Sequence, residues 1–288
     1  MISAKGLVYN SAGTRDLLKT AARETELVVQ LFGADIICIQ EAISQLVATG
    51  FQYFDLNAGC PVRKVIKTGA GAALLKNPDM LLSIMQTMLD IAGKRNVGIK
   101  MRPGWHCQDS IYLDLAQDFE SMGVGWISLH PRSAKQAFSG RADWDKLRIL
   151  NKKTSLPVIG SGDLFTGTDA LRCLQQTGIS GVMFARGALN NPMIFAEYLQ
   201  LLKGEKSKPG SMEQVIIMIR RHANLCQQFA SSHRSLLKMR TIAPRYVRGF
   251  NRAKDLRQKL SSCTSWERFE EILGQIKNQT KEENICQL

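Results

Sequence analysis

The sequence lacks the features that would place a protein in a membrane or outside the cell. No stretch is long and apolar enough to span a bilayer, and residues 1–10 lack the basic, apolar and small-residue succession of a secretory signal. The seven cysteines, at positions 38, 60, 107, 173, 226, 263 and 286, include no C-x-x-C pair and no Cys/His cluster. We therefore expect a cytoplasmic protein with no membrane segment, no disulfide framework and no metal site.

The sequence also lacks a dinucleotide fingerprint, which would require G-x-G-x-x-G directly after a strand. Gly69-x-Gly71 is followed by Leu74 at the third glycine position, and it lies well after the preceding predicted strand. This excludes a Rossmann-type nucleotide site at these glycines.

What the sequence does contain is enough apolar material for a large core, together with an uneven positive charge. Of its 288 residues 44% are hydrophobic, which fits one large α/β domain with an appendage, or two domains. The formal charge is +13; from Lys203 onward, 17 Lys and Arg stand against 8 Asp and Glu, which leaves 21 against 17 before it. A polyphosphate partner would favour this concentration, although a basic surface that binds nothing in particular also fits it.

From residue 27 to residue 202 the pattern alternates between short apolar runs, polar turns and helical spacing, which predicts a parallel sheet. The expected strands are Leu27–Phe32, Gln52–Leu56, Val97–Met101, Trp126–His130, Pro157–Gly160 and Gly181–Ala185. The expected helices are Ile36–Thr49, Pro78–Ala92, Ile111–Met122, Trp144–Leu150, Thr168–Gln175 and Pro192–Leu202. A doubly wound sheet and a (β/α)₈ barrel both satisfy this alternation.

Polar residues at the ends of the predicted strands favour the barrel. They are Gln30, Asn57 with Cys60, Lys100 with Arg102, His130 with Arg132, Gly160-Ser-Gly-Asp163 and Ala185-Arg-Gly187. Barrel enzymes assemble their sites at the carboxyl ends of several strands, so six strand ends of this kind indicate a TIM-type barrel.

The turn that contains Cys60 is the strongest candidate for a reactive site. Asn57, Gly59 and Pro61 stop the strand abruptly, and Pro61 restricts the backbone of Cys60. A cysteine is more often a small buried hydrophobe, but its position in this turn favours a reactive thiol.

The last two strand ends each lead into a helix, so backbone N–H groups and the guanidinium of Arg186 are placed to bind a phosphate. A phosphorylated cofactor would be the natural occupant. Ordinary turn chemistry explains the glycines of either loop equally well.

The polar segment 204–210 is the best domain boundary, and it divides residues 1–203 from a helical domain at residues 211–288. Helical spacing at Val215–Phe229, Leu236–Gly249, Arg252–Leu260 and Trp266–Ile276 predicts a small bundle. Its basic stretch consists of Lys238, Arg240, Arg245, Arg248, Arg252, Lys254 and Arg257, with Tyr246 and Phe250 between them.

Several motifs together resemble the bacterial tRNA-dihydrouridine synthases, in particular the B type, over nearly the whole chain. They are Asp55-Leu-Asn-Ala-Gly-Cys-Pro61, Gly69-Ala-Gly-Ala-Ala-Leu74, Lys100-Met-Arg102, His130-Pro-Arg132, Gly140-Arg-Ala-Asp-Trp144, Pro157-Val-Ile-Gly-Ser-Gly-Asp163 and Arg186-Gly-Ala-Leu-Asn-Asn-Pro192. The resemblance implies an FMN-binding barrel followed by a helical domain that binds tRNA. It also implies that reduced flavin delivers hydride to C6 of a uracil base while a cysteine protonates C5, with NADPH or NADH as the reductant.

The same resemblance assigns roles to individual residues. Cys60 is implied as the proton donor, and thiols ordinarily keep their proton at neutral pH, which suits that role. The implied flavin contacts are Gln30, Lys100, His130, Ser161, Gly162, Asp163, Ala185 and Arg186. The residues expected to meet the substrate are Asn57, Arg102, Arg132, Arg141, Arg245 and Arg248.

The chain departs from the family pattern in three places. Ser161 stands where the family usually has Asn, Ala185 stands where it has Gly, and Met1–Tyr9 resembles the segment just after the family's second strand. We therefore expect a barrel that is incomplete at its N-terminus. Two alternatives stay open, namely an inactive basic RNA-binding remnant, or another FMN barrel reductase that acts on a free pyrimidine, in the manner of a dihydroorotate dehydrogenase. Of the possible oligomeric states, a monomer is the expectation.

Overall fold

A computed structural model describes residues 1–21, 24–206, 210–248, 250 and 253–285, with side chains described as far as residue 275. The chain divides into two compact units. The first comprises Met1–Asp163 and Arg172–Met183, and the second comprises Leu164–Leu171 and Phe184–Leu288. The domain boundary expected at 204–210 stays a prediction, and residues 207–209 of that linker lie outside the described residues.

The first unit is built on a parallel sheet of seven strands among the described residues. They are β1 (Ile2–Ser3), β2 (Val28–Phe32), β3 (Tyr53–Ala58), β4 (Val97–Met101), β5 (Ile127–Leu129), β6 (Val158–Ser161) and β7 (Gly181–Met183). Each strand pairs with the next along the chain, so the order in space is the order in sequence. A doubly wound sheet reverses its order at a switch point, whereas a barrel wall does not. The structure thus confirms the barrel-type prediction, and no pairing among the described residues joins β7 to β1.

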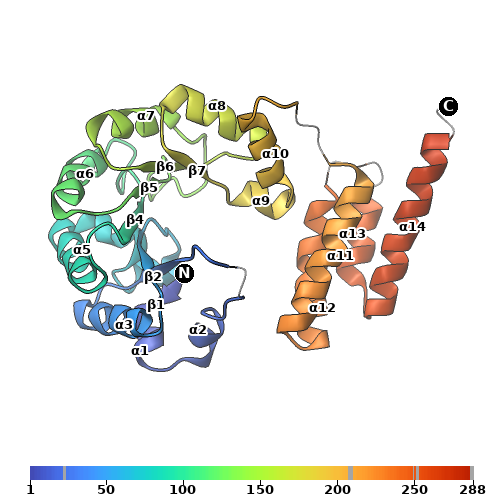
Figure 1. Cartoon of the computed structure of the whole chain (residues 1–288), viewed down its shortest axis with the longest axis horizontal. Helices are drawn as coiled ribbons and strands as arrows, with labels where there is room; N and C mark the ends of the chain where they lie inside the picture. The colour runs from blue at the N-terminus through green and yellow to red at the C-terminus, as the bar shows by residue number, and fades with distance from the viewer. Residues whose placement is uncertain (22–23, 207–209, 249, 251–252, 286–288) are drawn as a thin grey trace. The chain divides into compact units, whose positions relative to one another are not determined.

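Helices separate the strands and cover the sheet. They are α1 (Ala4–Val8), α2 (Ala12–Asp16), α3 (Ile36–Ala48), α4 (Arg63–Ile66), the 3₁₀ helix η1 (Gly71–Lys76), α5 (Pro78–Ala92), α6 (Ile111–Met122), α7 (Trp144–Lys153) and α8 (Gly167–Thr177). Figure 1 shows α3, α5, α6 and α7 along the outer side of the curved row of strands. Apolar side chains of these helices and of the strands form the core, and Ile39, Phe54, Leu81, Ile99 and Phe119 are fully buried.

Local sequence signals explain where the best-predicted helices begin and end. Asn77 caps α5 by accepting a hydrogen bond from the backbone N–H of Met80 at 3.2 Å, and Pro78 occupies the first turn. Gly123 ends α6 in the left-handed conformation, with φ of 86°. Both helices have the predicted bounds.

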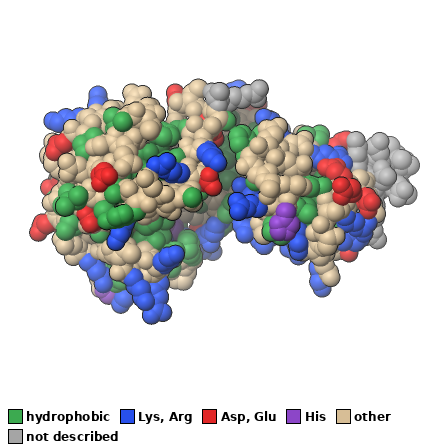
Figure 2. All heavy atoms as spheres, turned by 90° about the horizontal axis from the view of Figure 1, so that it is seen from below, with side chains coloured by type: hydrophobic (Ala, Val, Ile, Leu, Met, Phe, Trp, Pro, Cys, Tyr) green, Lys and Arg blue, Asp and Glu red, His purple; other side chains and the backbone are tan. Residues whose placement is uncertain are grey.

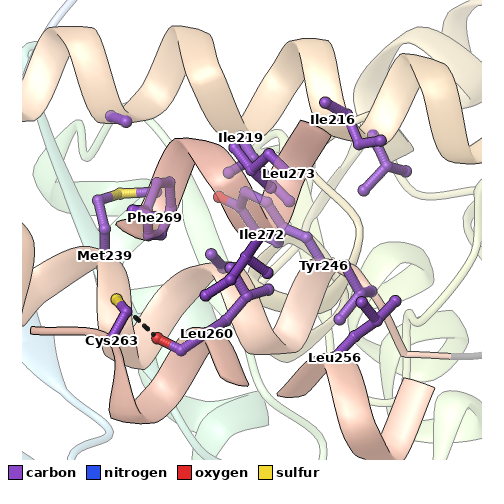
Figure 3. Close-up of a cluster of buried hydrophobic side chains, with 14 of the residues drawn as sticks. Ile216, Ile219, Met239, Tyr246, Leu256, Leu260, Cys263, Phe269, Ile272 and Leu273 are labelled. Carbon is purple, nitrogen blue, oxygen red and sulfur yellow. Dashed lines mark hydrogen bonds between the residues drawn. The ribbon is translucent and has the colours of Figure 1, made fainter. Parts of the chain in front are cut away.

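The second unit contains a helical bundle. Its helices are α9 (Arg186–Asn190), α10 (Ile194–Leu202), α11 (Met212–Phe229), α12 (Ser232–Tyr246), α13 (Ala253–Ser262) and α14 (Trp266–Ile285). Side chains from α11 to α14 point toward one another in a closed apolar core (Figure 3) that includes Ile219, Met239, Leu260, Phe269 and Leu273. The predicted bundle is therefore present, and a capping box of Ser211 and Gln214 starts it.

No helix within the described ranges is both long and apolar enough to cross a membrane. In the same part of the chain, no group of three or more His, Cys, Asp or Glu side chains is placed to hold a metal ion.

Candidate functional site

The polar residues of neighbouring strands project from one face of the sheet. In the register of the parallel strands, Gln30 on β2 is the partner of Asp55 on β3, and Asn57 on β3 is the partner of Lys100 on β4. Asp55 and Asn57 are two residues apart, so their side chains point to the same side. The side chains of Gln30, Asp55, Asn57 and Lys100 are therefore neighbours on one face of the sheet.

The Cys60 turn follows directly after β3 and is fixed by hydrogen bonds. Asn57 Oδ1 accepts from the backbone N–H of Gly59 at 3.2 Å and from that of Cys60 at 2.9 Å. The Cys60 carbonyl accepts from Ala72 N at 3.0 Å, and the Gly59 carbonyl accepts from Arg102 Nε at 2.7 Å. Cys60 is half-buried, so the turn presents a partly accessible thiol in a defined position.

Gly71 explains why η1 can pack against this turn. Its φ is 63°, which is in the left-handed region, and a Cβ at this position would lie 2.8 Å from the Cys60 carbonyl oxygen. A larger residue would therefore displace the turn that carries the thiol.

Buried charge surrounds the strand ends. Burial raises the pKa of Asp55 to about 6, although hydrogen bonds from Gln30 and Trp126 and the charge of Lys100 oppose this shift. Burial likewise lowers the pKa of Lys100, with the charge of Asp55 acting in the opposite direction. Lys100 and Asp55 thus lie near each other, and neither charge is well hydrated.

His130 lies just after β5 and is almost fully buried, with 8% of its surface exposed. Burial lowers its pKa to about 3, and the positive charges of Arg102, Lys100 and Arg132 add to the effect. The imidazole is therefore neutral at physiological pH. In a neutral imidazole one ring nitrogen can donate a hydrogen bond and the other can accept one.

Arg102 is buried, with 2% of its surface exposed, and its guanidinium binds the backbone of the loop that follows β5. Its Nη1 donates to the carbonyls of Arg132, Ser133 and Ala137 at 3.2, 2.8 and 3.0 Å. Its Nε bond to Gly59 links this loop to the Cys60 turn. Burial lowers the pKa of Arg102 to about 10, so the guanidinium stays charged at neutral pH. Its predicted contact with the target uracil stays a prediction.

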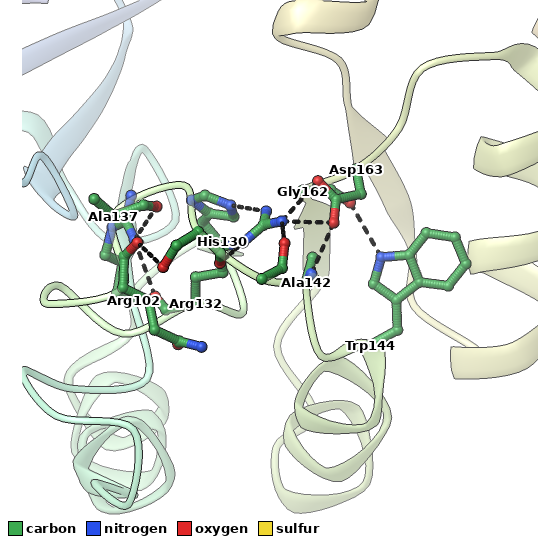
Figure 4. A network of polar contacts seen from close by, with 11 residues as sticks. Arg102, His130, Arg132, Ala137, Ala142, Trp144, Gly162 and Asp163 are labelled. Atoms are coloured by element: carbon green, nitrogen blue, oxygen red, sulfur yellow. Dashed lines mark hydrogen bonds and ion pairs between the residues drawn. The ribbon is translucent and has the colours of Figure 1, made fainter.

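Arg132 is equally buried and connects the same loop to the end of β6 (Figure 4). Its Nη2 contacts both carboxylate oxygens of Asp163, at 2.9 and 2.7 Å, and also donates to the Gly140 carbonyl at 2.6 Å. Asp163 accepts in addition from Ala142 N at 2.8 Å, and Trp144 Nε1 donates to the Gly162 carbonyl at 3.1 Å. Arg132 therefore joins Ser139 and Gly140 of the loop after β5 to Asp163 at the end of β6.

The glycine loop after β6 approaches His130 closely. Gly162 has φ of 103°, and a Cβ there would lie 2.8 Å from His130 Cδ2. Asp163 also has a positive φ, at 55°, and Ser161 is buried with its Oγ 3.5 Å from the Leu129 carbonyl. The carboxylate of Asp163 is directed at Arg132, and binding of an anion by the backbone of this loop stays a prediction.

The remaining predicted residues lie on exposed parts of the chain. Arg141 is exposed in the loop after β5, and Ala185 and Arg186 are exposed at the start of α9 in the second unit. The guanidinium carbon of Arg186 lies 5.2 Å from the centre of the Phe165 ring. The convergence of Arg186 with the Gly162 loop on one phosphate stays a prediction.

The helical unit carries the predicted basic residues on its surface. Arg245 and Arg248 are exposed, as are Lys238 and Lys254, and Arg252 lies outside the described residues. On the face drawn in Figure 2, Lys and Arg side chains are spread over this unit, with an acidic group among them. Arg240 and Arg257 are only partly exposed, and Arg240 Nε donates to the Ser261 carbonyl at 2.8 Å.

A cavity of about 810 Å³ lies in the first unit along the strands. Gln30, Asp55, Trp126 and Ser128 line it, and residues just before β2, β3, β5 and β6 extend it toward the amino ends of the strands. Ser128 Oγ is buried and has no hydrogen-bond partner among the described residues. The cavity is therefore lined by a residue whose buried hydroxyl, Ser128 Oγ, has no partner among the described residues.

Asp55 was missed as a site residue by the sequence reasoning, although it stands in the motif that ends at Pro61. The available signal was its spacing of two residues from Asn57 within a predicted strand, which places a carboxylate on the polar face. Only the structure shows that both of its oxygens accept hydrogen bonds, from Gln30 and from Trp126.

Comparison with known proteins gives a consistent result. The family model described as "Dihydrouridine synthase (Dus)" matches residues 1–282. A probable tRNA-dihydrouridine synthase of Treponema pallidum is 33% identical over 258 residues, which cover 86% of this chain and 76% of the relative. Probable tRNA-dihydrouridine synthase 1 of Synechocystis is 32% identical over 88% of this chain and 71% of its own length.

tRNA-dihydrouridine synthase B of Shewanella oneidensis is 31% identical over 210 residues, covering 73% of this chain and 65% of the relative. Among solved structures, morphinone reductase in complex with tetrahydroNAD aligns with a TM-score of 0.43 and 14% identity, over 61% of this chain and 50% of that chain.

Proposed function

The chain belongs to the dihydrouridine synthase family, and on this premise we propose that it reduces uridine in tRNA to 5,6-dihydrouridine with Cys60 as the proton donor. The observation that carries the proposal is the Cys60 turn. It holds a half-buried thiol at the carboxyl end of β3, beside the cations Lys100 and Arg102. A thiol held in a defined position at the carboxyl ends of barrel strands is a suitable general acid.

FMN is the proposed cofactor, and the side chains at the strand ends fit it. Gln30 carries a second amide N–H besides the one given to Asp55, and Lys100 adds a poorly hydrated ammonium. When bound and reduced, FMN supplies the hydride that adds to C6 of the uracil ring. NADPH is the proposed reductant of the flavin.

In this scheme Cys60 gives its proton to C5 of the uracil ring. The thiolate that results must be stabilised by neighbouring groups until solvent reprotonates it. The thiolate would be attracted by Lys100 and Arg102, both of which interact electrostatically with Cys60. His130 stays neutral beside them, so it offers hydrogen bonds without adding charge.

The helical unit is the proposed tRNA-binding surface. Arg245 and Arg248 are exposed near the end of α12, where they can contact phosphates of folded RNA. The target base must leave its stack to reach Cys60, at a cost of about a few kcal/mol that phosphate contacts elsewhere on the tRNA offset.

The test is product formation by purified protein supplied with FMN, NADPH and tRNA that lacks dihydrouridine. Cys60→Ala is expected to abolish dihydrouridine, measured by mass spectrometry of tRNA nucleosides, without loss of bound flavin absorbance. Cys107→Ala is the matched control, because Cys107 is an exposed cysteine of the same unit whose thiol lies 3.6 Å from Ser133 Oγ. Unchanged product yield in the Cys60 variant would remove its catalytic role.

A further inference from the structure

A continuous run of hydrogen bonds leads from the buried carboxylate of Asp55 to the backbone of Cys60. Gln30 Nε2 donates to Asp55 Oδ2 at 2.6 Å, and Asn57 Nδ2 donates to Gln30 Oε1 at 2.8 Å. Asn57 Oδ1 then accepts from the N–H groups of Gly59 and Cys60. Two side-chain amides thus connect one carboxylate to the turn that holds the thiol.

The direction of the bonds in this run is fixed from both ends, because the carboxylate of Asp55 can only accept and the backbone N–H groups of Gly59 and Cys60 can only donate. An ionised carboxylate only accepts, whereas an amide donates through nitrogen and accepts through oxygen. Because Gln30 turns its nitrogen to Asp55, its oxygen faces Asn57, and Asn57 then turns its own oxygen to the turn. If the amides were reversed, Asn57 Nδ2 would face two backbone N–H groups, and donors would oppose donors.

We propose that Asp55 is a positioning residue for Cys60: its carboxylate sets the orientation of Gln30 and Asn57 and thereby holds the turn that carries the thiol. The proposal rests on the role of Cys60 given above and extends it to a residue that acts through two others. Gln30 and Asn57 therefore have a task in the protein itself, besides their predicted contacts with flavin and uracil.

The surroundings of Asp55 fit a group whose charge has a positional role. Only 4% of its surface is exposed, and its other oxygen accepts from Trp126 Nε1 at 3.2 Å. The raised pKa of about 6 means that holding the ionised form there costs free energy, yet the group is ionised at neutral pH. Strongly perturbed groups of this kind are concentrated at functional sites.

Asp55→Asn tests the proposal because it keeps the shape of the side chain but replaces a carboxylate, which can only accept hydrogen bonds, by an amide, which can donate or accept. The new amide can present either a donor or an acceptor to Gln30, so the orientation of Asn57 is enforced only by the backbone N–H groups of Gly59 and Cys60. Hydrogen exchange of the Gly59 and Cys60 amides, measured by peptide-resolved mass spectrometry of the full chain at neutral pH, is expected to rise about five-fold. This is the ratio that one hydrogen bond of ordinary net strength supports.

Two further variants distinguish an effect of hydrogen-bond direction from a general destabilisation of the surroundings of Asp55. Trp126→Phe removes the other hydrogen bond to Asp55 and leaves the run toward Cys60 in place, so exchange in the turn should stay near wild type. The double variant Asp55→Asn with Gln30→Glu moves the carboxylate one position along the run. The carboxylate then accepts from position 55 and from Asn57, which restores the orientation of Asn57. Exchange at Gly59 and Cys60 should return to near the wild-type rate.

The proposal is overturned if Asp55→Asn leaves exchange in the turn unchanged, if Trp126→Phe raises it equally, or if the double variant fails to lower it. Should Asp55→Asn not fold, Gln30→Met interrupts the same run with a side chain of similar shape, and it must raise the exchange rate to the same extent. These outcomes do not depend on turnover. Loss of the proposed function would instead appear as dihydrouridine formation by Cys60→Ala, whatever the exchange rates are.

Discussion

Replacing Asp55 by Asn is expected to remove one pH-dependent contribution to the stability of the first unit. The pKa of Asp55 is about 6 in the folded protein, against an ordinary value of 3.8. Below about pH 4 both the folded and the unfolded states hold the proton, so the group contributes nothing. Between about pH 4 and 6 the unfolded state loses the proton while the folded state keeps it, and the free energy of unfolding falls as pH rises.

The difference between a pKa of about 6 in the folded protein and 3.8 in the unfolded chain corresponds to about 3 kcal/mol at pH 7. Asp55 is almost completely buried, so solvent screening reduces this figure little. Burial also lowers the pKa of Lys100, the cation facing Asp55 from β4, while the charge of Asp55 opposes that shift.

His130 acts in the same pH window with the opposite sign. Its pKa is about 3 in the folded protein, against an ordinary value of 6.5, so the unfolded state takes up a proton first as pH falls. This contributes stability that is present at pH 7 and is lost toward pH 3, by about 5 kcal/mol if fully expressed. The wild-type profile is thus the difference of two opposing effects, and single variants are needed to separate them.

Urea unfolding from pH 4 to pH 7, followed by a probe of the first unit, measures these effects. Asp55→Asn should gain stability relative to wild type as pH rises from 4 to 6, apart from a constant offset due to altered hydrogen bonds. His130→Gln should lose stability relative to wild type at pH 7 and approach it toward pH 4. Parallel profiles for wild type and Asp55→Asn would refute the buried, pKa-shifted state of this carboxylate.

Three further predictions concern the other parts of the site. Arg132→Ala should destabilise the first unit by about 3 kcal/mol, because it removes the buried partner of Asp163; chemical denaturation at neutral pH measures this, with the exposed Arg141→Ala as the control. Arg186→Ala should lower the flavin content of the purified protein more than its affinity for tRNA, and equal flavin absorbance in variant and wild type would contradict the phosphate contact. Charge reversal of Arg245 and Arg248 to Glu should weaken tRNA binding more at low than at high salt, whereas unchanged binding isotherms would exclude this surface.

The sequence predicts the strand ends well because their signals are local. Alternation of apolar runs and polar turns marks β2 to β7, and a proline with a preceding Asn cap marks the start of α5. The bounds differ where the signal is weak: β5 ends at Leu129, one residue before His130, and β3 continues to Ala58, past the predicted Leu56. The short helices α1, α2, α4 and α9 have no amphipathic period long enough to be recognised.

The environments of Arg102 and Arg132 could not be predicted from the sequence. Their positions after β4 and β5 are evident, but an arginine after a strand is equally compatible with a ligand contact and with a structural role. The carbonyls that bind the two guanidinium groups come from residues 59 and 132–140, which meet only when the loops fold against one another. Backbone acceptors leave no trace in the side-chain sequence.

The contacts of these arginines decide which cation of the site is best placed for an anionic ligand. Arg102 has its hydrogen bonds directed at carbonyl oxygens, and Arg132 forms an ion pair with Asp163. Lys100 differs, because its interactions with Asp55 and Cys60 are electrostatic and no hydrogen bond links its ammonium to another described residue. An ammonium that is poorly hydrated and near the thiol would gain most from a negative charge that forms beside it. This favours Lys100, rather than either arginine, as the group that stabilises the reduced flavin proposed here.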